Sequence, residues 1–114
     1  MTRVVHVAEA ALVPEPLDPS QVVSGAPEVR ASVLHASDDG RVERGIWEIT
    51  PGVVTDVEAD ELFVVVAGRA TIEVEGGPTL EVGPGDAVVL EAGARTRWTV
   101  HETLRKVYQV TADG

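Results

Sequence analysis

Four acidic side chains crowd into one short stretch of the chain: Asp56, Glu58, Asp60 and Glu61. A carboxyl group can act as a general acid or base when burial moves its pKa towards neutral. Several carboxylates together can instead hold a hard cation such as Mg²⁺ or Ca²⁺. A charged loop that faces water is the third alternative, and we interpret the three acids ahead of Glu61 in this way because a strongly acidic chain must expose most of its carboxylates.

Few other residues could support metal or nucleophilic chemistry. The absence of cysteine removes thiolate nucleophiles, disulfides and Cys-ligated metals. The three histidines, His6, His35 and His101, are distant in sequence from the acidic stretch. No serine lies in a nucleophile motif, and the turn Gly83–Asp86 lacks the lysine of a phosphate-binding loop. A carboxylate is therefore the strongest candidate for chemistry in this chain.

Composition limits the partners of the protein. Its 114 residues suit one domain, and 9 basic against 19 acidic residues give a net charge of −10. We expect no binding to nucleic acid or to anionic membrane surfaces, because both are negatively charged and attract basic proteins. We also expect no membrane span, because no apolar run approaches the roughly 18 residues that one needs. The N-terminus lacks a signal-peptide pattern, and with no cysteine present we predict a cytoplasmic protein.

The elements that position these side chains are predicted to be strands. Short β-rich runs alternate with Gly, Pro and Asp turns at the spacing of a sandwich or barrel. The apolar run Leu62–Ala67 is predicted to be a strand buried on both faces. Residues 1–28 read as a short strand at 4–8 followed by a proline-rich arm with one helical turn at Ser20–Val23. The predicted strands span residues 29–36, 42–49, 61–67, 70–75, 79–82, 87–90, 96–101 and 104–111.

Several short motifs then appear in a fixed order. They are Trp47–Gly52 (WEITPG), Glu61–Gly68, Gly83–Asp86 (GPGD), Trp98 and Arg105–Tyr108 (RKVY). Together they resemble the small single-domain cupins of the ethanolamine-utilisation and ureidoglycine-aminohydrolase branch. The resemblance implies an all-β double-stranded β-helix, the cupin jelly-roll barrel, over residues 29–114, with residues 1–28 as an extended N-terminal arm.

The same resemblance implies that the usual metal ligands are missing. Metal-binding cupins carry a His-x-His pair before the first-motif glutamate and a further histidine in the second motif. Aligned on Glu61, the pair falls on Val54–Asp56 or on Thr55–Val57, and the second-motif position falls on Thr96. Only Glu61 of the four ligands is present, so we expect neither a transition metal nor another cofactor.

If the alignment holds, Glu61 faces into the barrel together with Phe63 and Val65. An inward carboxylate must be paired, hydrogen-bonded or protonated, because a bare buried charge is unfavourable. The residues Thr96, Trp98 and Val100 are expected on the opposite wall, and His101 on the outer face. The possible neighbours of Glu61 are Glu48, Arg95, Arg97, Arg105, Lys106 and Tyr108, and the sequence does not select one of them.

Three functions remain open. The first is the binding of a small apolar or flat molecule in a metal-free barrel, between Phe63, Trp98 and Glu61. The second is a small isomerase, hydrolase or lyase in which Glu61 is the general acid or base. The third is a non-catalytic dimerisation module that pairs through Val64 and Val66, and a homodimer is expected. The predicted ligand-binding residues are Glu48, Phe63, Thr96, Trp98 and Tyr108; the sequence does not identify the ligand.

Overall fold

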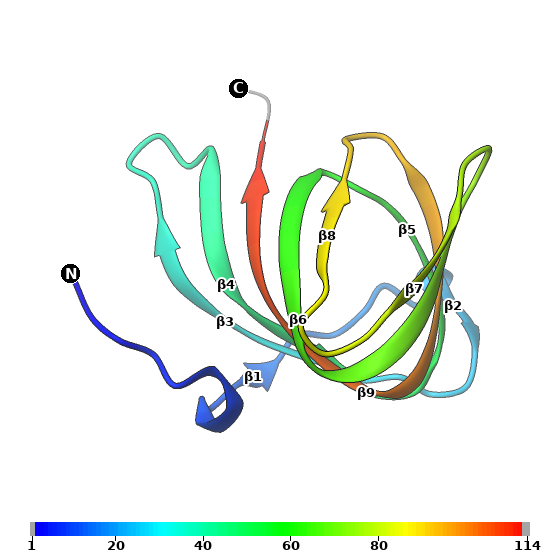
Figure 1. The fold of residues 1–114 in the computed structure, drawn as a ribbon, viewed down its shortest axis with the longest axis horizontal. Coiled ribbons are helices and arrows are strands. Elements are labelled where there is room, and N and C mark those ends of the chain that lie inside the picture. The colour runs from blue at the N-terminus through cyan, green and yellow to red at the C-terminus, as the bar shows by residue number, and fades with distance from the viewer. Residues whose placement is uncertain (1, 113–114) are drawn as a thin grey trace.

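The chain folds into a curled antiparallel sheet, shown in Figure 1. The structure is a computed structural model and describes residues 2–112. Its strands are β1 (Val13–Pro14), β2 (Val22–Ser24), β3 (Val29–Ala36), β4 (Val42–Ile49), β5 (Gly52–Val57), β6 (Asp60–Val74), β7 (Thr79–Val82), β8 (Ala87–Leu90) and β9 (Arg95–Thr111), and its 3₁₀ turns are η1 (Val7–Glu9) and η2 (Pro19–Gln21).

Two long strands, β6 and β9, shape the barrel. They run antiparallel to one another along almost their whole length. The first half of β6 and the second half of β9 form one layer with β3, β4 and β8, and the other two halves form the facing layer with β2, β5 and β7. Two facing antiparallel layers that share bent strands make a jelly roll, so the predicted all-β double-stranded β-helix is confirmed.

The bend in β6 depends on one glycine. The pairing of β6 with β9 shifts register between Val65 and Ala70. Gly68 lies inside this interval with a φ of +83°, a conformation that other residues rarely adopt. A Cβ at this position would collide with the carbonyl oxygen of Thr103 on β9. Glycine is therefore needed for the two layers to fold over one another.

Strict alternation along β6 separates the core from the outer face. Phe63 and Val65 are fully buried, whereas Leu62, Val64 and Val66 expose 47%, 39% and 37% of their surface. The prediction of a strand buried on both faces is thus wrong, because the side chains on the outer face of this part of β6 are exposed. The Thr96, Trp98 and Val100 side chains on β9 are buried as expected, and His101 is exposed.

The N-terminal arm runs along the outside of the barrel. The predicted strand at 4–8 is wrong, since Val7–Glu9 forms η1. The predicted helical turn begins one residue earlier than expected, at Pro19, where the Asp18 side chain accepts a hydrogen bond from the Ser20 amide. No helix of the described chain is long and apolar enough to cross a membrane.

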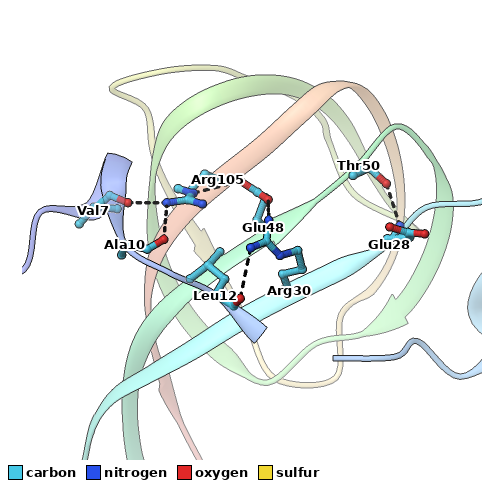
Figure 2. A network of polar contacts seen from close by, with 8 residues as sticks. All are labelled: Val7, Ala10, Leu12, Glu28, Arg30, Glu48, Thr50 and Arg105. Atoms are coloured by element: carbon cyan, nitrogen blue, oxygen red, sulfur yellow. Dashed lines mark hydrogen bonds and ion pairs between the residues drawn. The ribbon is translucent and has the colours of Figure 1, made fainter. Parts of the chain in front are cut away.

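Two arginines hold the arm by its backbone, as Figure 2 shows. One guanidinium nitrogen of Arg105 donates to the carbonyls of Val7 and Ala10 at 2.7 and 3.2 Å. Arg30 donates to the carbonyl of Leu12 at 3.2 Å. Glu48 joins both arginines, at 3.0 Å from Arg105 and 3.5 Å from Arg30. This network fixes the arm to β3, β4 and β9.

Candidate functional site

The carboxylate of Glu61 is paired inside the barrel with Lys106. Glu61 begins the inward row of β6, and Lys106 faces the same interior from β9, beside Val65 of β6. The Lys106 ammonium lies 2.7 Å from Glu61 Oε2, and the two side chains are only 7% and 8% exposed. The structure thus selects one partner from the six that the sequence left open. The predicted catalytic role of Glu61 stays a prediction.

Three aromatic rings surround the Lys106 ammonium. Its nitrogen lies 4.3 Å from the ring centroid of Phe63, 4.5 Å from that of Trp47 and 5.1 Å from that of Trp98. Trp98 packs against the other two rings at 5.6 and 5.8 Å. An ammonium above aromatic faces is attracted by their quadrupoles, and the attraction grows when water is excluded. The cation is therefore stabilised on one side by a carboxylate and on the others by rings.

A second carboxylate, Glu58, is also buried. Only 8% of the residue is exposed, and its Oε2 accepts hydrogen bonds from Thr96 Oγ1 at 2.6 Å and Trp98 Nε1 at 3.1 Å. The expectation that Glu58 faces water is wrong. The alternation of β5 contained the signal, because residues 54, 56 and 58 follow one another on the inward face. Backbone hydrogen bonds from the Glu58 amide to Ala94 and from Gly93 to Glu58 continue the pairing past the end of β5.

Asp56 lies between this interior and an open groove. It shares the inward face of β5 with Val54, opposite Thr96. Partial burial and the negative charge of Glu58 raise the pKa of Asp56 above its usual value. The groove has a volume of about 870 Å³ and lies beside the ends of β5, β6 and β9, and Glu58, Glu61 and Lys106 are not among the residues that line it. Its lining includes Gln21, Asp56, Thr96 and four charged rim residues, Glu73, Glu75, Arg95 and Arg97.

Tyr108 lies in the other layer of the barrel, on the second half of β9 between Gly45 and Phe63. Its hydroxyl donates a hydrogen bond to Glu43 Oε2 at 2.8 Å. Burial, together with this bond and the nearby negative charges, raises the pKa of Tyr108 well above its ordinary value. The ring packs directly on Gly45, where a Cβ would come within 2.6 Å of the hydroxyl oxygen. Tyr108 is therefore a neutral hydrogen-bond donor fixed in the wall of the barrel.

The structure brings together four of the five predicted ligand-binding residues. Phe63, Thr96, Trp98 and Tyr108 are all buried in the barrel. The fifth, Glu48, does not join them, because it alternates with the inward Trp47 and faces Arg105 and the arm (Figure 2). The sequence did not assign a site role to Trp47, Glu58 or Lys106. Only Trp47 and Lys106 belong to motifs that were recognised.

The residues at this site do not fit a metal ion. Across residues 2–112, no three His, Cys, Asp or Glu side chains come together as a metal-binding group. Asp60, the last of the four acids, is exposed and accepts a hydrogen bond from the Ala92 amide instead. His35 contacts Arg44 and His101 contacts Thr71, both on exposed surfaces. The ammonium of Lys106 already neutralises Glu61, and a second cation beside it would be repelled.

Comparison with known families agrees with this architecture. A family model described as the EutQ-like cupin domain matches residues 36–108. The chain belongs to the EutQ-like cupin family. The predicted resemblance to ethanolamine-utilisation cupins is thereby confirmed. None of the curated proteins matches the chain.

Solved cupin structures superpose well on the chain. It is similar to a DUF861-family protein of unknown function from Pseudomonas syringae, with 33% identity, a TM-score of 0.81 and coverage of 90% of this chain and 45% of that one. The chain thus spans less than half the length of that relative. EutQ from Clostridium difficile has 17% identity and a TM-score of 0.65, with 85% and 80% covered. Ectoine synthase from P. lautus has 20% identity and a TM-score of 0.66, with 96% and 78% covered. At such identities the last two show a shared fold alone.

Proposed function

We propose that the protein is a metal-independent cupin that binds a small molecule at the mouth of its barrel. The observation that carries the proposal is the buried ion pair of Lys106 and Glu61 within the cage of Trp47, Phe63 and Trp98. The lysine supplies the fixed positive charge beside the first-motif glutamate that a metal ion supplies in metal-binding cupins. A separate groove, lined by Asp56 and Thr96 among others, is open to a ligand near one end of the barrel.

The energetics of the pair favour a functional role. Taking two charges out of water is unfavourable, and apolar residues of similar size often stabilise a fold equally well. A barrel that only needed a core would be better filled by aliphatic side chains. Ligand pockets characteristically combine apolar walls with a few fixed polar groups, and here Glu58, Glu61, Thr96 and Lys106 are such groups.

The proposal is tested by elemental analysis of the purified protein together with a thermal-shift screen of small metabolites. We expect substoichiometric metal, and at least one compound that raises Tm equally with and without a chelator, because a ligand that binds only the native state stabilises it. Stoichiometric metal removable by the chelator would contradict metal independence. A screen without any stabilising compound would contradict the binding function.

A second candidate, self-association, is favoured by one observation. The outer face of β6 and β8 carries exposed apolar side chains at Leu62, Val64, Val66 and Val89. Apolar patches of this kind commonly mark interfaces. Light scattering on the intact protein should give the mass of a dimer, and Val64→Asp should reduce it to that of a monomer. The matched control Val4→Asp, at an exposed position on the arm, should leave the mass unchanged. A monomeric starting protein would exclude this candidate.

A further inference from the structure

Arg95 and Arg97, at the start of β9, supply the positive charge of the open groove. They alternate with the buried Thr96, so both side chains leave the strand on its exposed face, with their Cβ atoms about 7 Å apart. Neither guanidinium has a hydrogen-bond or ion-pair partner within residues 2–112. Two cationic groups on one face of one strand are therefore available to a ligand.

Most arginines of this chain are used by the protein itself. The guanidiniums of Arg30 and Arg105 hold the N-terminal arm. Those of Arg44 and Arg69 each donate to a side chain on the neighbouring strand β9. The chain has 19 acidic residues against 9 basic ones, so acceptors for a guanidinium are plentiful. The groove arginines lack partners because of where the fold places them.

Paired strands fix both arginines in position. Arg97 lies between Thr55 of β5 and Glu73 of β6 in the register of the sheet. Glu73 is directly opposite Arg97, at a spacing that allows an ion pair, but the two form none in the described chain. The Glu75 amide donates to the Arg95 carbonyl at 2.9 Å, which ties the end of β6 to the start of β9. A site built on such strands needs little ordering when a ligand binds.

We propose that this groove binds a small organic acid with a single carboxylate, held by Arg95 and Arg97. The inference rests on the proposed binding function and narrows it to one class of ligand. A guanidinium presents a planar fork of N–H donors that matches the two oxygens of a carboxylate. The groove has a volume of about 870 Å³, within the range of small-molecule pockets, so it can admit the carbon chain behind the carboxylate.

The acidic residues of the groove limit the charge of the ligand. Asp56, Glu73 and Glu75 line it together with the two arginines, so three carboxylates accompany two guanidiniums. A second negative charge on the ligand would be repelled by these carboxylates. A hydroxyl group on the ligand could instead donate hydrogen bonds to them. The groove therefore favours a monocarboxylate over a dicarboxylate or a phosphate ester.

A titration of the intact, ¹⁵N-labelled protein followed by amide NMR spectra both measures and locates binding. The probes are butyrate, succinate and butylammonium, added at constant ionic strength. We expect saturable shifts with butyrate at the amides of Thr55, Glu73 and Arg97. The affinity for butyrate should exceed that for succinate or butylammonium by about fivefold or more.

Three exposed arginines provide the variants and their control. Arg95→Gln and Arg97→Gln should each weaken butyrate binding by about fivefold or more, because each removes a charged donor to the carboxylate. Arg41→Gln removes the same charge from the turn between β3 and β4, outside the groove. Arg41 likewise has no side-chain partner in the described chain, so Arg41→Gln should leave the affinity unchanged.

The inference is overturned if butyrate gives no saturable shift, or if Arg41→Gln weakens binding as much as Arg95→Gln and Arg97→Gln do. Butylammonium binding as tightly as butyrate would refute the anionic class, and tighter binding of succinate would refute the limit to one charge. In each case a metabolite screen that still yields a stabilising compound leaves the broader binding function standing. Failure of that function would appear separately, as a screen without any stabilising compound.

Discussion

Replacing Lys106 with methionine tests whether the buried ion pair is as dehydrated as the structure indicates. Methionine keeps the length and apolar stem of the side chain, so the core keeps its packing. The substitution removes the only cation that pairs with Glu61 in the described chain. It also removes the ammonium from the faces of Trp47, Phe63 and Trp98. Glu61 is then left as an unpaired carboxylate in an apolar surrounding.

The magnitude follows from burial. Breaking a buried pair by removing one partner costs about 3–5 kcal/mol, and we expect Lys106→Met to fall in this range. Replacing the other partner, Glu61→Gln, should reduce stability less, by about 2–3 kcal/mol, because the three rings still stabilise the ammonium. The double variant should lose less than the sum of the two, with a coupling energy of about 2 kcal/mol. Either loss is a large part of the 5–15 kcal/mol that holds a typical domain folded.

Urea denaturation followed by tryptophan emission and by circular dichroism measures these free energies. The control is the exposed pair of Arg69 and Glu102, whose atoms approach to 2.6 Å but whose side chains are about 60% exposed. Arg69→Met should cost less than about 1 kcal/mol despite the shorter distance, because water screens an exposed pair. If Lys106→Met costs no more than Arg69→Met, or if the double variant is additive, the pair is solvated and the reasoning on this site fails.

Three further predictions concern other parts of the fold. The pKa of Asp56 is raised, so between its usual value of 3.8 and its raised value the native state holds more protons than the unfolded state, and the stability of the fold decreases as pH rises. Asp56→Asn should remove this decrease and stabilise the fold by less than about 1 kcal/mol at neutral pH. Tm measured against pH for both proteins tests the prediction. Gly68→Ala should destabilise the fold by about 3 kcal/mol, because the added Cβ would collide with the Thr103 carbonyl and alanine would have to adopt a positive φ. An unchanged midpoint of urea denaturation would contradict the described bend. Arg105→Ala should release the N-terminal arm, so that a protease cleaves the chain ahead of residue 13 faster than in the original protein while the barrel stays folded. Equal cleavage rates in the two proteins would contradict the role of Arg105.

Local patterns were enough to predict most of the barrel. Alternation and turn residues located β3, β4, β7 and β8 at their observed bounds. The same alternation placed Phe63 and Trp98 in the interior. Strand β5 was missed because its sequence, GVVTDV, leads directly into the acids and reads as part of a polar loop. The two long strands were divided at their bends, where Gly68 on β6 and the polar run before Leu104 on β9 interrupt the apolar pattern.

The partner of Glu61 could not be predicted because it depends on register between distant strands. Lys106 and Arg105 are adjacent in sequence and face opposite sides of β9, so a shift of one residue would exchange them. Only the pairing of Val65 with Lys106 puts the lysine inside and leaves the arginine for the arm. The burial of Glu58 was not predicted for a related reason. The sequence alone does not show that strand-like pairing, and with it the inward alternation of side chains, continues past Val57 to residue 58.

The grip of Arg105 and Arg30 on the arm has a consequence for how this protein can change. Both arginines bind carbonyl oxygens, which every amino acid carries, so the arm is recognised by its path rather than by its side chains. Many side chains should therefore be tolerated at the exposed positions of the arm. Substitution of Glu48, Arg30 or Arg105 should be tolerated less well, because Glu48 pairs with both arginines. The exposed positions ahead of Leu12 could be rewritten, in evolution or by design, to carry a tag or a new binding motif, whereas the buried Leu12 must stay apolar.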